Sequence, residues 1–241
     1  MSLPLVHAGG DGPPALMIHG FGADALSWTP LVAPLAARHA VWTVDLPAHG
    51  RAGPLPADCA PADLAALVAT ALERFDAPVS LVGHSLGAAV ALHVADQRPD
   101  RVGALVLIAP AGWGTGLDAR FLRELPRVET DGQAQALLAR LVARPGFITP
   151  AMARHVLAGL AAEGRRADLA RLAEAMLAAP PPPAPRAGAT VLWGTEDAIN
   201  PRDPDRPLPE GVALHSIEGA GHMPHAEVAG RVGRLVAQAL G

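Results

Sequence analysis

Residues 78 to 92 read PVSLVGHSLGAAVAL, an apolar run that stops at Ser85 and resumes as an alanine-rich stretch typical of a helix. We interpret the segment as a strand and a helix joined by a sharp turn at the serine. Strand and helix pass close together at such a turn, so the residues two before and two after its centre must be small. Gly83 and Gly87 meet that requirement. The segment therefore predicts a nucleophile at Ser85, with a serine in an ordinary glycine turn as the alternative.

Length and composition indicate one large globular domain. The chain has 241 residues, half of them hydrophobic, and a formal net charge of −4. This length suits one α/β core with a modest insertion better than two independent cores. The 19 basic residues are dispersed and outnumbered by 23 acidic ones. We therefore expect no nucleic-acid partner.

The sequence predicts no membrane or secretory role. No apolar stretch approaches the roughly 20 residues needed to cross a bilayer. The start of the chain, Met1 to Pro4, lacks the basic and apolar regions of a signal peptide, and Met1 to Leu3 are either native or a remnant of expression. The single cysteine, Cys59, has no partner for a disulfide and no adjacent base, so we expect it to be inert. The expected compartment is the cytoplasm.

The absence of one residue type excludes several chemistries. Every basic residue is arginine, and the chain contains no lysine. A Schiff-base lysine, a phosphate-loop lysine, a serine–lysine dyad and a lipoyl or biotinyl attachment site are therefore excluded within this chain. We expect no cofactor.

Strand-length apolar runs alternate with helix-length segments along most of the chain. The runs fit buried parallel strands better than alternating surface strands. This alternation predicts an α/β fold with a doubly wound, mostly parallel open sheet. We place the strands at 15–18, 41–45, 79–83, 104–109, 189–194 and 212–217. The helices between and after them fall at 26–38, 61–75, 85–97 and 225–239.

The alternation is interrupted between residues 113 and 186, where apolar residues recur at helical spacing, as from 134 to 142. We interpret 113 to 186 as a helical cap inserted into a core formed by 1 to 112 and 187 to 241. The insertion ends in a proline-rich stretch, 180 to 185, which we interpret as a stiff return linker. A proline-rich motif that docks partner domains is the alternative.

A nucleophilic serine needs a neutral imidazole to take its proton and a carboxylate to orient that imidazole. In an open α/β sheet with this kind of turn, the three residues follow in the order serine, acid, histidine, each on a loop after a strand. Asp197 and His222 lie in such loops after the last two predicted strands. We therefore predict Ser85, Asp197 and His222 as the catalytic residues. Glu196, next to the aspartate, is the alternative acid.

His225 lies three residues after the predicted base. The two histidines could form a metal-binding pair, but no cluster of further ligands with suitable spacing accompanies them. Pro224 instead places His225 on the first turn of the last helix. We expect no metal.

The developing oxyanion requires hydrogen-bond donors, which in this arrangement are two backbone amides. One follows the nucleophile and belongs to Leu86. The other lies in the loop after an early strand, where the sequence His19 Gly20 Phe21 Gly22 allows the amide of Phe21 to turn inward.

Two further histidines have a structural interpretation. His49, in the loop after the strand ending at Asp45, is expected to help seat neighbouring loops. His84, beside the nucleophile, is expected to pack or form a hydrogen bond beneath the turn. We assign the role of base to neither.

Taken together, these segments resemble the α/β-hydrolase fold superfamily over nearly the whole chain. The resemblance implies a serine hydrolase that cleaves an ester, thioester or related acyl bond through an acyl-enzyme, of the carboxylesterase or thioesterase type. A serine at the turn argues against the haloalkane dehalogenases and epoxide hydrolases of the superfamily, which use aspartate. The matching motifs are residues 19–22, 45–50, 83–87, 193–197 and 219–222.

Within the superfamily, residues 107–114 and 219–223 most resemble the hydrolase-type domain of the dihydrolipoamide acyltransferase-like proteins of acetoin dehydrogenase systems. Members of that type carry a lipoyl-lysine module, whereas this chain has no lysine. Ala48 and Ala88 stand where many members have glycine. Both are small enough to preserve close packing, although the backbone at Ala48 is less free.

The resemblance leaves several functions open. An acyltransferase, a C–C bond hydrolase or lyase on the same residues, and a non-catalytic partner of a dehydrogenase complex are alternatives to hydrolysis. The expected partner is a small-molecule acyl substrate, with a homodimer or a dehydrogenase complex as further alternatives. On the cap, Arg120, Arg123 and Arg127 form either a carboxylate-binding group or, more commonly for such spacing, a solvated helix face.

Overall fold

A computed structural model describes residues 3–241 of the chain, so Met1 and Ser2, whose origin the sequence leaves open, lie outside the described residues. Its centre is a seven-stranded sheet in the order β1-β3-β2-β4-β5-β6-β7. All neighbouring strands are parallel except β1, which is antiparallel to β3. The predicted fold class, a doubly wound and mostly parallel open sheet, is confirmed. The strands are β1 Leu5–Gly9, β2 Pro14–Ile18, β3 Ala40–Val44, β4 Val79–His84, β5 Val102–Ile108, β6 Thr190–Gly194 and β7 Ala213–Ile217.

Strand β1 was not predicted from the sequence. It is not a buried apolar run: β1 (LVHAG) lies at the edge of the sheet and is exposed at His7 and Ala8. Its pairing with β3 is also irregular between His7 and Gly9. Short, bulged and partly polar edge strands protect a sheet from pairing with other chains, and they give little periodic signal.

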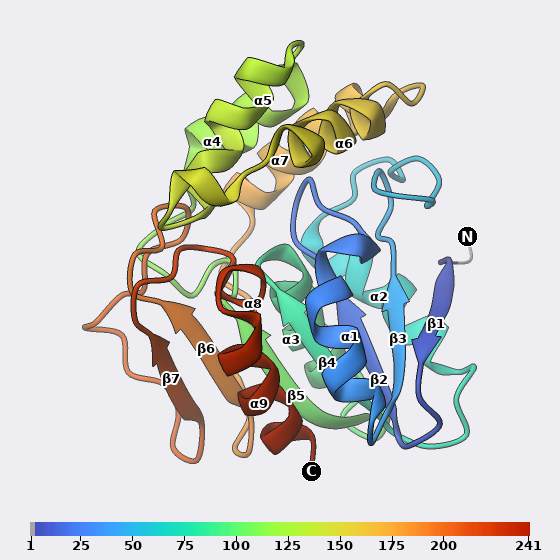
Figure 1. Ribbon diagram of the computed structural model, residues 1–241. Helices are drawn as coiled ribbons and strands as arrows, with labels where there is room; N and C mark the ends of the chain where they lie inside the picture. Colours follow the sequence, from blue (N-terminus) through green and yellow to red (C-terminus); the bar gives the residue numbers. More distant parts are fainter. Residues whose placement is uncertain (1–2) are drawn as a thin grey trace.

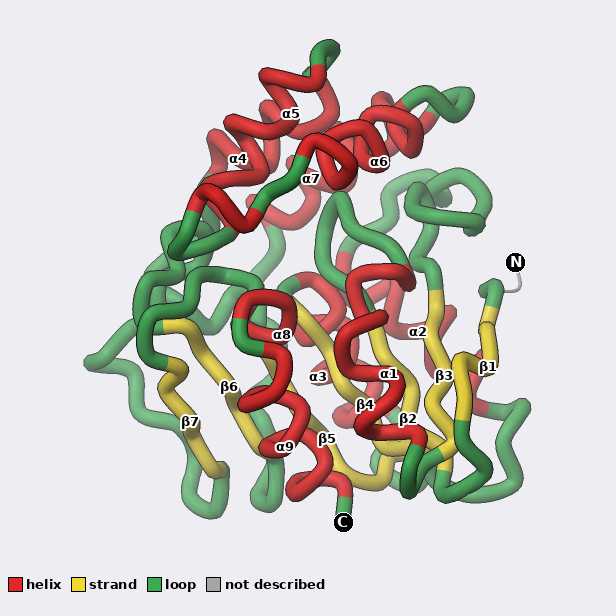
Figure 2. The backbone as a smooth tube through the Cα atoms, viewed as in Figure 1, coloured by secondary structure: helices red, strands yellow, loops and turns green. Residues whose placement is uncertain are grey.

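Helices cover both faces of the sheet (Figures 1 and 2). On one face, α1 and α9 pack over a core that includes Trp28 and Leu31, and α2 and α3 cover the other face. The helices of the core are α1 Thr29–Ala36, preceded by the 3-10 turn η1 Ala25–Trp28, with α2 Pro61–Leu72, α3 Leu86–Gln97, α8 Pro224–Glu227 and α9 Ala229–Leu240.

The predicted last helix, 225–239, is in fact two helices. They are separated at Val228, whose backbone (φ −133°, ψ 47°) is not helical. The break follows Glu227, whose side chain turns inward and accepts hydrogen bonds from backbone amides outside its own helix. A tertiary interaction thus overrides the continuous apolar pattern.

Between β5 and β6 the chain forms a helical layer above the carboxyl ends of the strands (Figure 1). The segment 180–185, which follows this layer and leads to β6, has no regular secondary structure. Among residues 3–241, no helix combines the length and apolar character that crossing a membrane requires. The elements of the layer are α4 Ala119–Glu124, η2 Leu125–Arg127, α5 Asp131–Leu138, η3 Ala139–Leu141, η4 Pro145–Phe147, α6 Pro150–Leu160 and α7 Arg165–Ala178.

Candidate active site

Ser85 lies at the turn between β4 and α3 in a strained backbone conformation (φ 51°, ψ −113°). Two hydrogen bonds hold the turn against the neighbouring strand and its loop. The Ser85 N–H donates to the carbonyl of Ile108 (2.9 Å), and the Ala111 N–H donates to the carbonyl of Ser85 (3.1 Å). Non-glycine residues hold such conformations only where their surroundings enforce them, and these residues cluster at functional sites.

Gly83 and Gly87, on either side of Ser85, lie so close to other backbone atoms that neither position has room for a side chain. A Cβ added to Gly83 would lie 2.5 Å from the carbonyl oxygen of Gly87. One added to Gly87 would lie 2.1 Å from the carbonyl oxygen of Ile18, on the adjacent strand. Ala88, at a position where the family resemblance suggested glycine, is fully buried. Close packing is therefore preserved there, as the sequence suggested.

Asp197 and His222 come together beneath the cap. The Nδ1–H of His222 donates to one carboxylate oxygen of Asp197 over 2.8 Å, and both side chains are almost fully buried. The other carboxylate oxygen accepts the N–H groups of Ile199 and Asn200, at 2.9 Å each. Asp197 therefore fixes the tautomer of His222 and leaves its Nε2 free to accept a proton. The alternative acid, Glu196, is exposed.

His84 supports His222 from below. Its Nε2–H donates to the backbone carbonyl of His222 over 2.8 Å. Burial, followed by the proximity of His225 and His222, holds the pKa of His84 well below its ordinary value, so the ring is neutral. The residue forms the hydrogen bond beneath the turn that the sequence suggested.

His225 is buried on α8, and its ring packs against Trp28 and His84 with centroid separations of 4.8 and 4.5 Å. Neither ring nitrogen has a hydrogen-bond partner among the described residues. Burial lowers the pKa of His225 to about 3. Residues 3–241 contain no group of three or more side chains arranged to hold a metal ion.

The amides of Phe21 and Leu86 are the two predicted oxyanion donors. Within the described part of the chain, neither amide has a hydrogen-bond acceptor. The loop that carries Phe21 is held by His49, whose Nε2 accepts the Gly22 N–H over 2.9 Å while its Nδ1–H donates to Pro47. Burial lowers the pKa of His49 to about 3, which keeps Nε2 available as an acceptor.

A cavity of about 400 Å³ lies between the cap and the core. Ser85, His222, Phe21 and His49 line it from the core, and side chains of all four cap helices line it from above. Ser85 and His222, two of the three predicted catalytic residues, therefore border a space large enough for a small-molecule substrate.

The cap arginines singled out in the sequence do not line this cavity. Arg120 and Arg123 are exposed and pair with Glu124 and Glu174. Like Arg127, they belong to a solvated helix face, which settles that alternative. The arginine on the cavity is Arg165, whose guanidinium donates to the carbonyl of Gly50 at 3.0 and 3.1 Å.

Two residues that the sequence analysis did not single out hold the catalytic loops. The Nδ2 of Asn200 donates to the carbonyls of Ala109 and Pro110, at 3.1 and 2.9 Å, and thereby ties the Asp197 loop to the end of β5. The carboxylate of Glu227 accepts the N–H groups of Gly221 (2.7 Å) and Ala143 (2.8 Å).

Cys59, the single cysteine of the chain, lies outside this cavity. Its thiol is buried, and burial together with the nearby Asp63 raises its pKa to about 11. A thiol with so high a pKa is a poor nucleophile at neutral pH, in line with the inert cysteine expected from the sequence.

The chain has relatives of known name and structure. A family model described as "Alpha/beta hydrolase family" matches residues 15–235. The dihydrolipoyllysine-residue acetyltransferase component of the acetoin cleaving system of Pseudomonas putida is 33% identical over 238 residues, which cover 93% of this chain and 62% of that protein. This chain thus spans less than two thirds of that relative's length.

Two further comparisons involve proteins of similar length. The pimeloyl-[acyl-carrier protein] methyl ester esterase of Chromobacterium violaceum is 32% identical over 232 residues, which cover 89% of each chain. The crystallised 2-hydroxy-6-oxo-6-phenylhexa-2,4-dienoate hydrolase of a Rhodococcus strain superimposes with a TM-score of 0.84 over 99% of both chains. Its sequence identity is 19%, so this likeness concerns the fold alone.

Proposed function

Because the chain belongs to the alpha/beta hydrolase family, we propose that it is a serine hydrolase that cleaves an ester, thioester or related acyl bond. The observation that carries the proposal is the buried hydrogen bond between Asp197 and His222, beside a cavity that Ser85 also lines. An oriented imidazole and a serine on one cavity are the parts that acyl transfer through a serine requires.

In the proposed reaction, the Oγ of Ser85 attacks the acyl carbonyl while the Nε2 of His222 takes its proton. The tetrahedral intermediate collapses as His222 returns that proton to the departing alcohol or thiol, which leaves an acyl-serine. Water, deprotonated by the same Nε2, then attacks the acyl carbon, and Ser85 recovers its proton as the carboxylic acid leaves. Asp197 stays ionised and stabilises the imidazolium that forms in each half-reaction.

The amides of Phe21 and Leu86 are proposed to stabilise the oxyanion in both half-reactions. Donors that are already oriented cost no reorganisation when the charge develops, and the removal of one such donor typically slows catalysis by about a hundredfold to a thousandfold. His49 supports this arrangement by holding the Gly22 amide, next to that of Phe21.

Hydrolysis of p-nitrophenyl acetate and butyrate tests the proposal. We expect Ser85→Ala and Asp197→Asn to lower kcat by a factor of about 10⁴ or more, while their unfolding temperatures stay near that of the wild type. Glu196→Gln is the matched control and should retain activity, because Glu196 is exposed. Full activity in Ser85→Ala would overturn the proposal and favour a non-catalytic role.

Acyl transfer to a thiol or alcohol is a second candidate, favoured by the name of the Pseudomonas putida relative. Transfer uses the same acyl-serine and differs only in the acceptor. Product analysis in the presence of competing thiols and alcohols separates the two functions. A dominant thioester or ester product at low acceptor concentration would indicate transfer, and free acid would indicate hydrolysis.

A further inference from the structure

We propose that the cavity binds a medium-length, unbranched aliphatic acyl chain, and that this chain lies at the enclosed end of the cavity beneath α4, η2 and α7. This inference rests on the proposed function and specifies its substrate class. It concerns the acyl side of the scissile bond, whereas the leaving group faces the opposite, open end.

The first argument is the chemistry of the cavity wall. Apart from His155 and Arg165, the cap contributes aliphatic side chains, Gly159 and one aromatic ring, that of Phe121. The two polar side chains already have hydrogen-bond partners, Asp24 and the Gly50 carbonyl. A polar acyl group lying along the rest of the wall would therefore lose its hydration without compensation. The aliphatic lining residues of the cap include Leu122, Leu125, Leu169 and Met176.

The second argument is that the two ends of the cavity differ in exposure. At the enclosed end, Leu125 and Met176 are 1% and 5% exposed, and Leu122 and Leu169 are buried with them. At the open end, Leu26 is 64% exposed and is the only large hydrophobic residue among residues 3–241 that is exposed. An apolar chain gains most at the enclosed end, because there it is removed from water on all sides.

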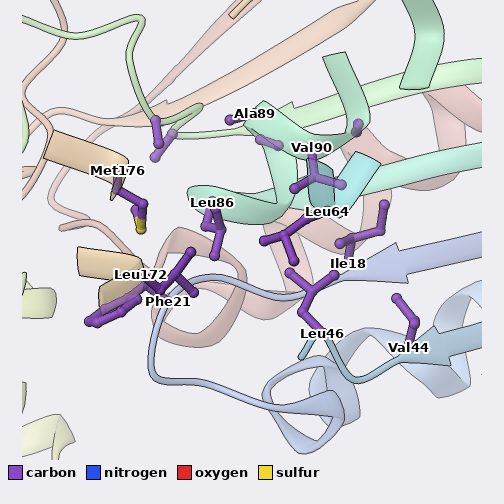
Figure 3. Packing of buried hydrophobic residues seen from close by; sticks show 14 of the residues in the cluster. Ile18, Phe21, Val44, Leu46, Leu64, Leu86, Ala89, Val90, Leu172 and Met176 are labelled. Atoms are coloured by element: carbon purple, nitrogen blue, oxygen red, sulfur yellow. The ribbon is translucent and has the colours of Figure 1, made fainter. Parts of the chain in front are cut away.

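The enclosed end also adjoins the proposed oxyanion donors. Leu125 packs so closely on the Phe21 loop that a Cβ on Gly22 would lie 2.0 Å from one of its methyl groups. Figure 3 shows Phe21 and Leu86 close to Leu172 and Met176 of α7. An acyl carbonyl bound at the two amides would therefore direct its chain toward Leu125 and Met176.

The open end carries a polar pair. His155 of α6 forms a 2.6 Å hydrogen bond with the carboxylate of Asp24, and both residues line the cavity beside Leu26. A leaving group that is polar or extends into solvent is compatible with this end, and an aliphatic chain is not favoured there. We therefore assign the acyl chain to the enclosed end and the leaving group to the open end.

The third argument is size. At roughly 30 Å³ for each water-sized group, a cavity of about 400 Å³ holds on the order of ten heavy atoms in all, including any part of the leaving group that lies inside the open end. An acetyl group would leave most of this apolar space unfilled. The acyl group therefore differs from the acetyl group in the name of the Pseudomonas putida relative.

A series of p-nitrophenyl esters from acetate to hexadecanoate tests the inference on the wild-type protein. We expect kcat/KM to rise about fourfold per added methylene, up to roughly eight to ten carbons, and then to level off or fall. If kcat/KM does not change with chain length, or is highest for acetate, the inference is overturned. Hydrolysis of acetate in that case would still support the proposed function. No hydrolysis of any ester, with Ser85 unreactive, would instead overturn the proposed function.

An ester with a charged acyl chain distinguishes an apolar acyl-binding site from one that binds an anion. Arg165 also borders the cavity, so an ester whose acyl chain ends in a carboxylate is compared with the aliphatic ester of equal length. We expect the carboxylate to lower kcat/KM by about a hundredfold. A higher kcat/KM for the carboxylate-bearing ester would contradict the aliphatic assignment.

Filling the enclosed end gives an independent test. In Met176→Trp, the ratio of kcat/KM for octanoate to that for acetate should fall by about tenfold or more, because the larger ring occupies space meant for the distal carbons. Ala178→Trp adds the same ring at an exposed position of α7 outside the cavity and should keep the wild-type ratio. An unchanged ratio in a folded Met176→Trp would refute the placement of the chain.

Discussion

At the scale of single residues, the site depends on backbone positions that tolerate little change. Ser85 adopts a positive φ of 51°, a conformation that costs on the order of 1–3 kcal/mol for a side chain of this kind. Hydrogen bonds to Ile108 and from Ala111 hold it there. Gly87 lets α3 start directly against β2. The strain at the serine is thus sustained by the packing of the sheet.

Gly87→Ala should therefore destabilise the fold. The added methyl group would meet the Ile18 carbonyl, so β2 and α3 must separate, and we expect the free energy of unfolding to fall by about 3 kcal/mol or more in urea titration. Gly132→Ala is the matched control. No atom lies within 4 Å of its added Cβ in α5, so we expect a gain of up to about 1 kcal/mol. Equal effects at both positions would contradict the close-approach argument.

The buried histidines predict a loss of stability in acid. The folded-state pKa of His225 is about 3, lower than the ordinary 6.5 of the unfolded chain. Between these values the unfolded state binds a proton that the folded state does not, so the free energy of unfolding decreases as the pH falls from about 6.5 toward 3. His49, with a pKa of about 3, and His84, also lowered, contribute in the same direction.

Replacement of one buried histidine should make the free energy of unfolding depend less steeply on pH. His225→Leu keeps the site apolar against Trp28 and eliminates one proton-binding group, so stability measured by urea titration should decrease less between pH 7 and pH 4.5. Ser216→Ala, at an exposed position of β7, removes no titratable group, so it is the control and should keep the wild-type slope. An unchanged slope in His225→Leu would refute the assignment.

At the scale of elements, Glu227 joins three segments. Its carboxylate at the end of α8 binds the amide of Gly221, next to His222, and the amide of Ala143, in the cap. The Met223 N–H donates to Leu141, also in the cap, over 3.2 Å. The cap is therefore attached to the loop that carries the proposed base, and its position and that of His222 are coupled.

Glu227→Gln should lower kcat for both acetate and octanoate esters by about tenfold to a hundredfold. A glutamine oxygen can accept one of the two amide bonds, while its amino group cannot accept the other, so the His222 loop loses support. Glu218→Gln, exposed in the same region, is the control and should be neutral. If kcat falls only for the octanoate ester, Glu227 positions the cap and does not support the His222 loop.

The sequence predicts a strand or a site residue only where the pattern that marks it is local in the chain. Buried strands were recognisable because their apolar runs are continuous: 189–194 was predicted and β6 spans 190–194. Ser85, Asp197 and His222 were recognisable because each follows such a strand. Asn200 was not, because its partner is a backbone group 91 residues away, and no local pattern encodes such a pair. For Glu227, the contact with Ala143 is equally distant in the chain, at 84 residues, and only its contact with Gly221 is local.

At the scale of the whole molecule, the sheet positions the predicted catalytic residues and the cap forms most of the cavity wall. The carboxyl ends of the parallel strands meet at one edge, where loops from distant parts of the chain bring the predicted residues together. The cap covers this edge and supplies most of the apolar wall (Figure 1). Its helical nature was predictable from spacing, whereas the faces that its helices turn toward the cavity depend on tertiary packing.

Covalent labelling determines whether Ser85 is the nucleophile. The folded protein is incubated with a fluorophosphonate probe, its intact mass is measured, and the modified peptide is sequenced, which distinguishes Ser85 from Ser27, a second serine on the cavity. We predict one adduct, on Ser85, that is absent in Ser85→Ala and forms at least about a hundredfold more slowly in Asp197→Asn. A folded wild-type protein that stays unlabelled, or that carries the adduct on Ser27, would contradict the account.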